Sequence, residues 1–123
     1  MKHRILIVED HEVVRESFTE LISLEPDLEV AGAVGTGTEA LAWLADALPD
    51  LVLVDISLPK MSGIDLVHRL RATHPALKAL IVSGHERELY LQQAEQAGAA
   101  GYVSKHEAVK TLLPTIRRVL SEA

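Results

Sequence analysis

Five short apolar runs, each followed by a longer amphipathic stretch, constrain the fold of this chain more than any other feature. The runs are residues 5–8, 28–34, 51–54, 80–82 and 102–103. Three of them are apolar at consecutive positions, which is typical of strands covered on both faces of a parallel sheet. Between the runs, apolar residues recur at helical spacing. Examples are Val14, Phe18, Leu21 and Ile22; Leu41, Leu44 and Leu48; Ile64, Val67 and Leu70; and Val109, Leu112, Leu113 and Ile116.

The alternation of strands and helices predicts an α/β fold with a single parallel sheet. Strand–helix–strand connections are right-handed, so the helices cover both faces and form three layers, α/β/α. For five strands the natural doubly wound arrangement is the flavodoxin-like (βα)5 sheet, with strand order 2-1-3-4-5. The fourth helix, at residues 86–97, has the least apolar inner face of the set.

Local signals predict several helix ends. Thr36 and Glu39 have the spacing of a capping box, which starts the second helix. Pro49 and Pro75 mark the ends of the second and third helices, because the residue before a proline disfavours the helical conformation. Pro114 lies inside the fifth helical pattern and removes one backbone hydrogen bond, so we expect a local bend there.

The composition fits one ordinary globular domain. The chain has 123 residues, of which 48% are hydrophobic, so we expect one domain over residues 1–123. It contains no cysteine, which excludes disulfides, zinc-thiolate sites and thiol nucleophiles. The formal net charge of -6 argues against binding a nucleic-acid backbone through this chain alone. The first apolar run is too short for a signal peptide or a membrane span, so we expect a cytoplasmic location and no membrane partner.

Ionisable and hydroxyl side chains stand at the ends of four of the runs. Glu9 and Asp10 follow the first run, Asp55 the third, Ser83 the fourth and Lys105 the fifth. Parallel strands all end at one edge of the sheet, so these side chains should converge in the crevice where such folds bind ligands. Three carboxylates in one place repel each other unless a pKa rises or a hard cation binds between them. The set therefore suggests a Mg²⁺ site.

The same residues suggest phosphoryl transfer. Asp55 would be the nucleophile, Lys105 and a metal ion would neutralise the phosphoryl oxygens, and Ser83 would donate a hydrogen bond to one of them. Taken singly, each residue has a simpler interpretation. Asp10 fits a helix N-cap, Ser83 a loop hydroxyl and Lys105 a solvated surface charge. Their joint placement at four strand ends favours the functional interpretation.

Four segments of the chain resemble the receiver domains of response regulators in two-component systems. These segments are ILIVED, LVLVDISLPKMSGIDL, LIVSG and AGAAGYVSK, and the resemblance covers essentially the whole chain. Glu9, Asp10, Asp55, Ser83 and Lys105 all stand where that family has its functional residues. The resemblance implies that a sensor histidine kinase transfers a phosphoryl group to Asp55. A receiver of this kind is not a conventional enzyme, because it catalyses only its own phosphorylation and dephosphorylation.

The resemblance also implies a ligand set and a switch. Mg²⁺, or Mn²⁺ in its place, would be bound by Asp10, Asp55 and the backbone carbonyl of Ser57, with Glu9 assisting through water. Ser83 and Tyr102 match the family's switch pair, which rearranges the surface of the fourth helix, fifth strand and fifth helix. His11 and His85 flank the acidic pocket, and we further hypothesise that Ser57 and His85 tune how long the phosphoryl group survives. The other histidines are scattered and form no ligand motif.

The segments VEDHEVVRESF and AGAAGYVSK are similar in particular to the NarL/FixJ subfamily. Members of that subfamily regulate transcription through a C-terminal helix-turn-helix domain, so DNA would be a partner only through an output domain outside residues 1–123. In this chain Glu9, Ser83 and His106 replace the family's commoner Asp, Thr and Pro. The first two changes preserve the chemistry, and the third predicts an ordinary trans peptide bond between Lys105 and His106.

Three points stay open from the sequence. Phosphorylated receivers often form homodimers, and the stripe of Val109, Leu112, Ile116 and Val119 is either a dimer surface or, as we favour, the core-facing side of the fifth helix. A flavodoxin-like FMN carrier would share the fold, although Glu9 and Asp10 put negative charge where a phosphate would bind. A stand-alone receiver, or a pseudo-receiver that binds a partner without phosphorylation, is the other alternative.

Overall fold

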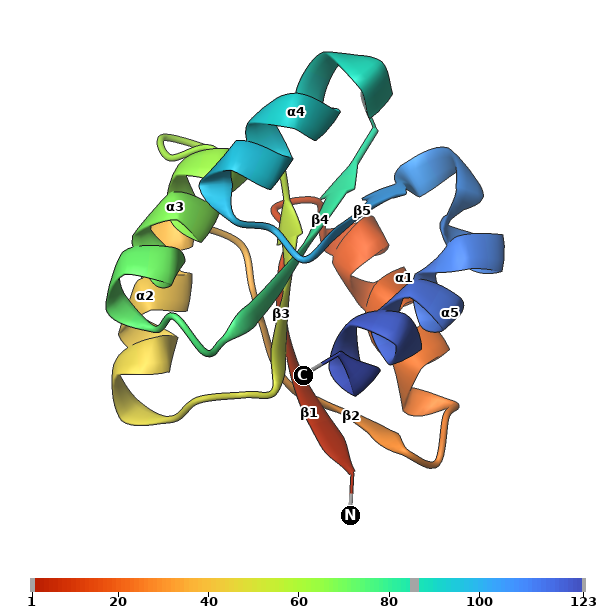
Figure 1. The fold of residues 1–123 in the computed structure, drawn as a ribbon. Coiled ribbons are helices and arrows are strands. Elements are labelled where there is room, and N and C mark those ends of the chain that lie inside the picture. The colour runs from red at the N-terminus through yellow and green to blue at the C-terminus, as the bar shows by residue number, and fades with distance from the viewer. Residues whose placement is uncertain (1, 85–86, 123) are drawn as a thin grey trace.

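The structure, a computed structural model, describes residues 2–84 and 87–122. Strands and helices alternate along the whole chain (Figure 1). In order they are β1 (His3–Val8), α1 (Glu12–Ser23), β2 (Leu28–Val34), α2 (Gly37–Asp46), β3 (Leu51–Asp55), α3 (Gly63–Thr73), β4 (Lys78–Ser83), α4 (Arg87–Ala97), β5 (Gly101–Ser104), the 3-10 turn η1 (Lys105–Glu107) and α5 (Ala108–Ser121). Each predicted apolar run is a strand, so the predicted alternation is confirmed.

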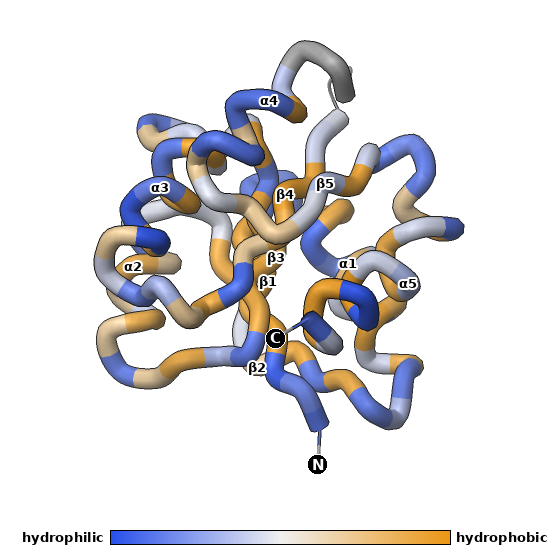
Figure 2. The backbone as a smooth tube through the Cα atoms, viewed as in Figure 1, coloured by the Kyte–Doolittle hydropathy of each residue, from blue (hydrophilic) through white to orange (hydrophobic). Residues whose placement is uncertain are grey.

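The five strands form one parallel sheet in the order β2-β1-β3-β4-β5. Helices α1 and α5 cover one face of this sheet, and α2, α3 and α4 cover the other (Figure 1). The predicted doubly wound, three-layer α/β/α fold is therefore confirmed. The hydropathy colouring is mostly hydrophobic along the central strands, whereas hydrophilic and hydrophobic residues alternate along the helices (Figure 2).

The sheet separates two apolar cores. Leu6 and Val8 of β1 pack with residues of α2, α3 and α4, whereas Ile5 and Ile7 pack with residues of α1 and α5. Alternate side chains of a strand point to opposite faces, so one continuous apolar run supplies both cores. This double coverage explains why the central strands carry no alternating polar positions.

The orientation of helix α5 shows whether its apolar stripe faces the core or the solvent. Leu112, Ile116 and Val119 are fully buried against the sheet, while Val109 is 87% exposed and lies off that stripe. The stripe is thus the core-facing side of the helix, and including Val109 in it was wrong. Pro114 lies inside α5, which continues to Ser121.

Helix α2 begins as predicted and ends earlier than its apolar pattern suggested. The Thr36 side chain accepts a hydrogen bond from the Glu39 backbone N–H and caps the helix. The helix ends at Asp46, so Leu48, expected on the inner helical face, lies beyond the end and is 53% exposed. Within the described residues no peptide bond is cis, so the predicted trans bond between Lys105 and His106 is confirmed.

In the described part of the chain, no helix is both long enough and apolar enough to cross a bilayer.

Candidate functional site

The carboxyl ends of the strands bring the predicted site residues together. Asp55 is the last residue of β3, and Ser83 is the last residue of β4. The sheet register places Asp55 beside Val82 and Ser83 beside Ser104, so these ends are level with one another. Glu9 directly follows β1, and Lys105 directly follows β5. The predicted convergence at one edge of the sheet is therefore present.

Lys105 connects the two buried carboxylates of this edge. Its Nζ lies 2.7 Å from Oε1 of Glu9 and 3.3 Å from Oδ1 of Asp55. Glu9 and Asp55 are 1% and 2% exposed, so the ammonium is the charge that balances two carboxylates removed from water. Lys105 reaches this position because β5 ends beside β4 and the chain turns at once into η1.

The ionisation of these groups reflects their burial. Burial raises the pKa of Asp55, and the charge of Glu9 raises it further, while Lys105 and a backbone hydrogen bond from Ser57 act in the opposite direction without cancelling the rise. Burial alone would lower the pKa of Lys105. Its hydrogen bond to Glu9 and the charges of Asp55 and Glu9 outweigh burial and raise that pKa. The site thus favours a charged lysine and disfavours a second buried negative charge.

His11 joins the cluster from the start of α1. Its backbone N–H donates to Oε2 of Glu9 at 3.0 Å, and its ring Nδ1 lies 3.2 Å from both Oε2 of Glu9 and Oδ1 of Asp10. His11 is also the residue at the N-cap of α1, where its side chain makes no capping hydrogen bond. Asp10 is therefore not the N-cap that its isolated position suggested, and its carboxylate faces the cluster.

The donor set fits a bound divalent cation. One donor atom from each of Glu9, Asp10, His11 and Asp55 can be chosen so that all lie within 4.8 Å of one another. Among the described residues Oδ2 of Asp55 has no hydrogen-bond partner, although it is buried. A buried carboxylate oxygen without a partner is costly, and a metal ion in this space would satisfy it. Oxygen donors of this kind are those that Mg²⁺ binds in proteins.

The loop after β3 is held close beneath Asp55. The Gly63 N–H donates to the Ile56 carbonyl at 2.9 Å, and a Cβ added at Gly63 would lie 2.1 Å from the Asp55 carbonyl oxygen. A side chain at residue 63 would therefore collide with the backbone of Asp55 itself. Ser57, proposed to offer its backbone carbonyl, is an exposed residue at the start of this loop.

Ser83 and Tyr102 lie on neighbouring strands, as a switch pair would require. Ser83 is fully buried at the end of β4. Tyr102 on β5 packs against the core beneath α2, α3 and α4, and its buried hydroxyl has no hydrogen-bond partner among the described residues. Tyr102 also lines a polar pocket together with Glu95 of α4 and Arg118 of α5, so this pocket lies between β5 and both helices. His85, proposed to tune phosphoryl lifetime, lies outside the described residues.

Sequence reasoning missed Arg15 as part of this site. Its guanidinium Nη1 donates to the Glu9 backbone carbonyl at 2.8 Å and ties α1 to the loop that carries the acidic pair. The signal was present but weak: Arg15 stands four residues after His11, so both lie on one side of the helix. The sequence does not reveal that this side turns back toward the end of β1.

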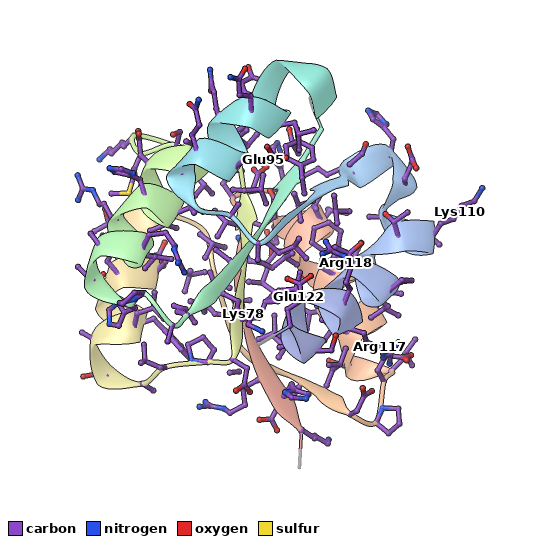
Figure 3. All side chains as sticks on the ribbon, viewed as in Figure 1. Lys78, Glu95, Lys110, Arg117, Arg118 and Glu122 are labelled. Carbon is purple, nitrogen blue, oxygen red and sulfur yellow. The ribbon has the colours of Figure 1, made fainter. Side chains whose placement is uncertain are left out.

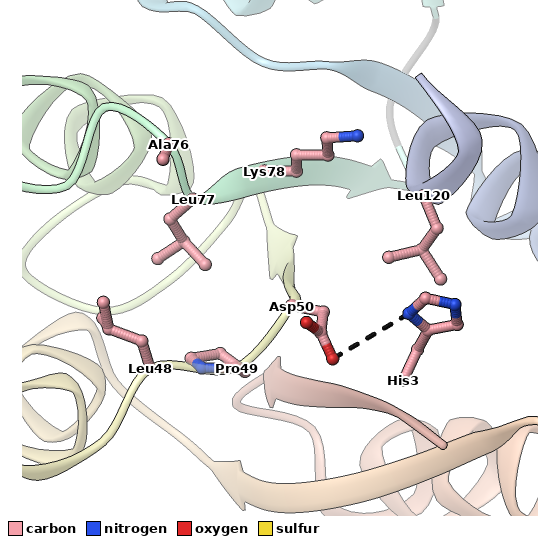
Figure 4. A pocket seen from close by; sticks show the side chains of 8 residues that line it. All are labelled: His3, Leu48, Pro49, Asp50, Ala76, Leu77, Lys78 and Leu120. Atoms are coloured by element: carbon pink, nitrogen blue, oxygen red, sulfur yellow. Dashed lines mark ion pairs between the residues drawn. The ribbon is translucent and has the colours of Figure 1, made fainter. Parts of the chain in front are cut away.

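The opposite edge of the sheet has a pocket of about 300 Å³. Figure 4 shows the side chains that line it, with Leu48, Leu77 and Leu120 among them. His3 and Asp50 form an ion pair there at 4.0 Å between Nδ1 and Oδ2 (Figure 4). None of the predicted site residues lines this pocket. The strand ends near Asp55 are therefore the candidate site.

The parallel (βα)5 sheet and its acidic pocket define the CheY-like class of signalling domains. The sequence profile of the response regulator receiver domain matches residues 5–117, and the chain belongs to that family. Receiver domains bind Mg²⁺ at an acidic pocket and are phosphorylated by histidine kinases, and phosphorylation-dependent switching is the general function of the family.

Relatives support the same assignment. The chain is 37% identical over 102 residues to the DNA-binding transcriptional activator DevR/DosR of Mycobacterium tuberculosis, covering 83% of this chain and 47% of the relative. It is 32% identical over 118 residues to the response regulator GacA of Pseudomonas viridiflava, covering 96% and 55%. The chain thus spans about half the length of these relatives.

Solved structures agree with the fold. The chain is similar to a LuxR-family two-component response regulator from Aurantimonas sp. SI85-9A1, with a TM-score of 0.93, 31% identity, and coverage of 98% of this chain and 86% of that one. It is also similar to the receiver domain of a NarL regulator from Mycobacterium tuberculosis, with a TM-score of 0.92, 27% identity, and coverage of 99% and 98%. The resemblance to this subfamily is confirmed.

Proposed function

We propose that Asp55 is the phosphoacceptor of this receiver domain and that a sensor histidine kinase supplies the phosphoryl group. The observation that carries this proposal is the buried Oδ2 of Asp55, which has no hydrogen-bond partner in the described part of the chain and lies beside the Lys105 ammonium. A carboxylate in this setting is exposed to little water and lies next to a fixed positive charge. Both features suit an in-line attack on phosphorus, because such transfer depends on positioning and charge neutralisation.

Each residue of the pocket has a distinct task in the transfer. An oxygen of Asp55 forms the new bond to phosphorus as the bond to the kinase histidine nitrogen breaks, and the electron pair of that bond returns to the imidazole. Lys105 lies 3.3 Å from Asp55 and can follow the phosphoryl oxygens as their charge develops. Ser83, at the end of the adjacent strand, donates to one of these oxygens.

The residues proposed for Mg²⁺ are Asp10, Asp55 and the backbone carbonyl of Ser57, with Glu9 assisting through water. The bound ion, or Mn²⁺ in its place, supplies positive charge for the phosphoryl oxygens. The Glu9 carboxylate divides its oxygens between Lys105 and His11, so it orients the ammonium while holding the loop of Asp10. Arg15 holds the same loop through the Glu9 carbonyl.

The switch would run from Ser83 to Tyr102. Movement of the Ser83 hydroxyl toward a phosphoryl group vacates space near β5. The Tyr102 ring, whose hydroxyl has no hydrogen-bond partner among the described residues, then follows. This movement alters the surface formed by α4, β5 and α5, where Glu95 and Arg118 line a pocket with Tyr102. Ser57 and His85 are proposed to set how quickly water removes the phosphoryl group.

The output is proposed to be transcription regulation. Residues 1–123 form the receiver domain, and a helix-turn-helix output domain outside these residues would contact DNA. Two facts support this view: the relatives include a DNA-binding transcriptional activator, and the chain spans about half of their length. We place the protein in the cytoplasm, with a homodimer formed on phosphorylation. The domain catalyses only its own phosphorylation and dephosphorylation.

The test is phosphorylation by a small-molecule donor. Wild-type protein incubated with acetyl phosphate and Mg²⁺ should gain the mass of one phosphoryl group, measured by intact mass spectrometry. Asp55→Asn should gain none, while Asp50→Asn, a matched change before the same strand, should behave as wild type. No gain in the wild type contradicts the proposal and favours a pseudo-receiver that acts by binding alone. A gain that persists in Asp55→Asn also contradicts it, because the phosphoryl group would then be on another residue.

A further inference from the structure

The His11 side chain places a nitrogen atom among the carboxylates of the acidic pocket, although Mg²⁺ binds through oxygen ligands alone. Its Nδ1 lies 3.2 Å from Oε2 of Glu9 and 3.2 Å from Oδ1 of Asp10. The ring therefore stands between two carboxylates, with the Asp55 carboxylate also within 4.8 Å of the chosen donor atoms. The ring itself is 66% exposed, so solvent reaches it from outside the cluster.

An independent observation indicates that something binds within this cluster. Oδ2 of Asp55 is buried, and no described residue hydrogen-bonds to it. Asp55 as a whole is 2% exposed, so bulk water is not available to that oxygen. The cluster thus contains a buried carboxylate oxygen with no hydrogen-bond partner in the described part of the chain, together with an imidazole nitrogen at its solvent side.

The identity of the donors decides which ions suit the cluster. Mg²⁺ prefers oxygen ligands and gains little from an imidazole nitrogen. Zn²⁺, Ni²⁺ and Cu²⁺ bind imidazole well, and for one mixed site the affinities of divalent ions rise along the series toward Cu²⁺. A site with two or three carboxylates and one histidine therefore suits these ions better than it suits magnesium. Zn²⁺ is the redox-inactive member with flexible geometry, and it accepts both donor types.

We propose that His11 makes the acidic pocket a mixed nitrogen and oxygen site that binds Zn²⁺ in competition with Mg²⁺. The ion takes the Nδ1 lone pair of neutral His11, whose proton then resides on the solvent-facing Nε2. Carboxylate oxygens of Asp10 and Asp55 complete the set of protein donors. Glu9 remains with Lys105 through Oε1, so the ammonium keeps its place beside Asp55.

The consequence for signalling rests on the proposed function of Asp55. A zinc ion that binds the Asp55 carboxylate engages the same oxygens that would attack phosphorus. Zn²⁺ would therefore reduce phosphorylation at a given Mg²⁺ concentration. The binding proposal itself does not depend on phosphorylation, so the two can be tested separately.

Binding affinities give the first test. Isothermal titration calorimetry with Zn²⁺ and, separately, Mg²⁺ would use the wild type, His11→Gln and the control His68→Gln, which changes an exposed histidine on α3. We expect His11→Gln to weaken Zn²⁺ binding by at least about tenfold while changing Mg²⁺ binding much less, a loss in the range of altered metal sites. His68→Gln should match the wild type. Equal losses for both ions, or an unchanged Zn²⁺ affinity, would overturn the proposal.

A spectroscopic readout locates the nitrogen ligand directly. Cu²⁺ added in place of Zn²⁺ should give an electron paramagnetic resonance spectrum with nitrogen hyperfine coupling in the wild type and in His68→Gln. That coupling should be lost in His11→Gln, and Asp55→Asn should weaken binding of the ion. Nitrogen coupling that survives in His11→Gln would place the ion at another histidine and refute the assignment. Neither readout involves phosphoryl transfer, so failure here leaves the acetyl phosphate test of Asp55 intact.

Discussion

The sheet has an amino edge, where its strands begin, and a carboxyl edge, where they end. Each edge carries an aspartate and a lysine, but the surroundings of these charged groups differ. Asp50 lies just before β3, with a half-exposed side chain, and accepts a hydrogen bond from the Arg4 backbone N–H at 2.7 Å. Asp55 ends β3, is buried, and has one oxygen without a partner among the described residues. The two carboxylates stand at opposite ends of one strand.

The lysines of the two edges differ in the same way. Lys78, at the start of β4, donates to the Val119 carbonyl at 2.7 Å and also to the Glu122 carbonyl, so it caps the end of α5 (Figure 3). Lys105, after β5, serves two buried carboxylates. Charges at the amino edge join elements and satisfy the backbone. Within the described residues, charges at the carboxyl edge are buried without all their hydrogen bonds, which costs free energy. A bound metal ion and a phosphoryl group can offset this cost.

The largest stability effect is expected from Gly63→Ala. The added methyl group would lie 2.1 Å from the Asp55 carbonyl oxygen, so the backbone beneath the acceptor must shift. We expect a loss of about 3 kcal/mol in the free energy of unfolding, together with slower phosphorylation. Urea denaturation followed by circular dichroism measures the stability.

Gly101→Ala is the matched control at the amino edge. Its added Cβ would first meet the ends of flexible side chains, Leu80 Cδ1 at 2.9 Å and Arg118 Nη2 at 3.0 Å. These atoms can move, so the loss should be clearly smaller than for Gly63→Ala. Equal losses would show that the carboxyl edge has no special dependence on close backbone approach.

Lys105→Met should have the next largest effect. It removes the ammonium that lies between Glu9 and Asp55, and two buried carboxylates then face each other. We expect a loss of about 2 kcal/mol near neutral pH, which is less than the usual loss for a broken buried ion pair because Lys105 is partly solvated. Chemical denaturation without metal ions measures this loss. Adding Asp55→Asn should restore part of it, and strict additivity of the two changes would contradict the charge explanation.

Asp55→Asn alone should stabilise the metal-free protein. The folded-state pKa of Asp55 is raised above 3.8, chiefly by burial and then by Glu9, so the protonated form is favoured by folding. Its contribution to stability is present below pH 3.8 and is lost as pH rises through the raised pKa. The variant should therefore be more stable than the wild type by about 1 kcal/mol near neutral pH, with the difference shrinking toward acid.

Thermal melts in a chelator across this pH range test the sign. A difference that stays constant with pH would indicate that Asn stabilises the fold by packing and not by removing a buried charge. Adding Mg²⁺ should stabilise the wild type more than the variant, because the ion binds the folded site.

Much of this comparison could be predicted from the sequence. Apolar runs fix which segments are strands, and the parallel arrangement then brings Glu9, Asp55, Ser83 and Lys105 to one edge without any knowledge of side-chain geometry. The strand order followed from the number of strands and the handedness of their connections. The sequence therefore predicted where the site residues lie along the strands and at which edge of the sheet they meet.

The remaining features depend on how helices rotate against the sheet. Helical spacing grouped Val109 with Leu112 and Ile116, but the orientation of α5 exposes Val109. The same limitation hid Arg15, because its bond to Glu9 depends on the direction in which α1 leaves the loop. His11 was recognised as a neighbour of the pocket, whereas its position between two carboxylates follows from backbone geometry at the helix start.

Asp50→Asn should have the smallest effect and is the sharpest check on the contrast between the edges. It makes the same chemical change as Asp55→Asn at the other end of β3. The asparagine oxygen can still accept from the Arg4 N–H, and the lost ion pair with His3 is exposed and long at 4.0 Å. We expect a stability change within about 0.5 kcal/mol, with little dependence on pH. A change in phosphorylation rate, or a stabilisation matching that of Asp55→Asn, would mean that the two carboxylates experience similar environments and that burial does not distinguish the edges.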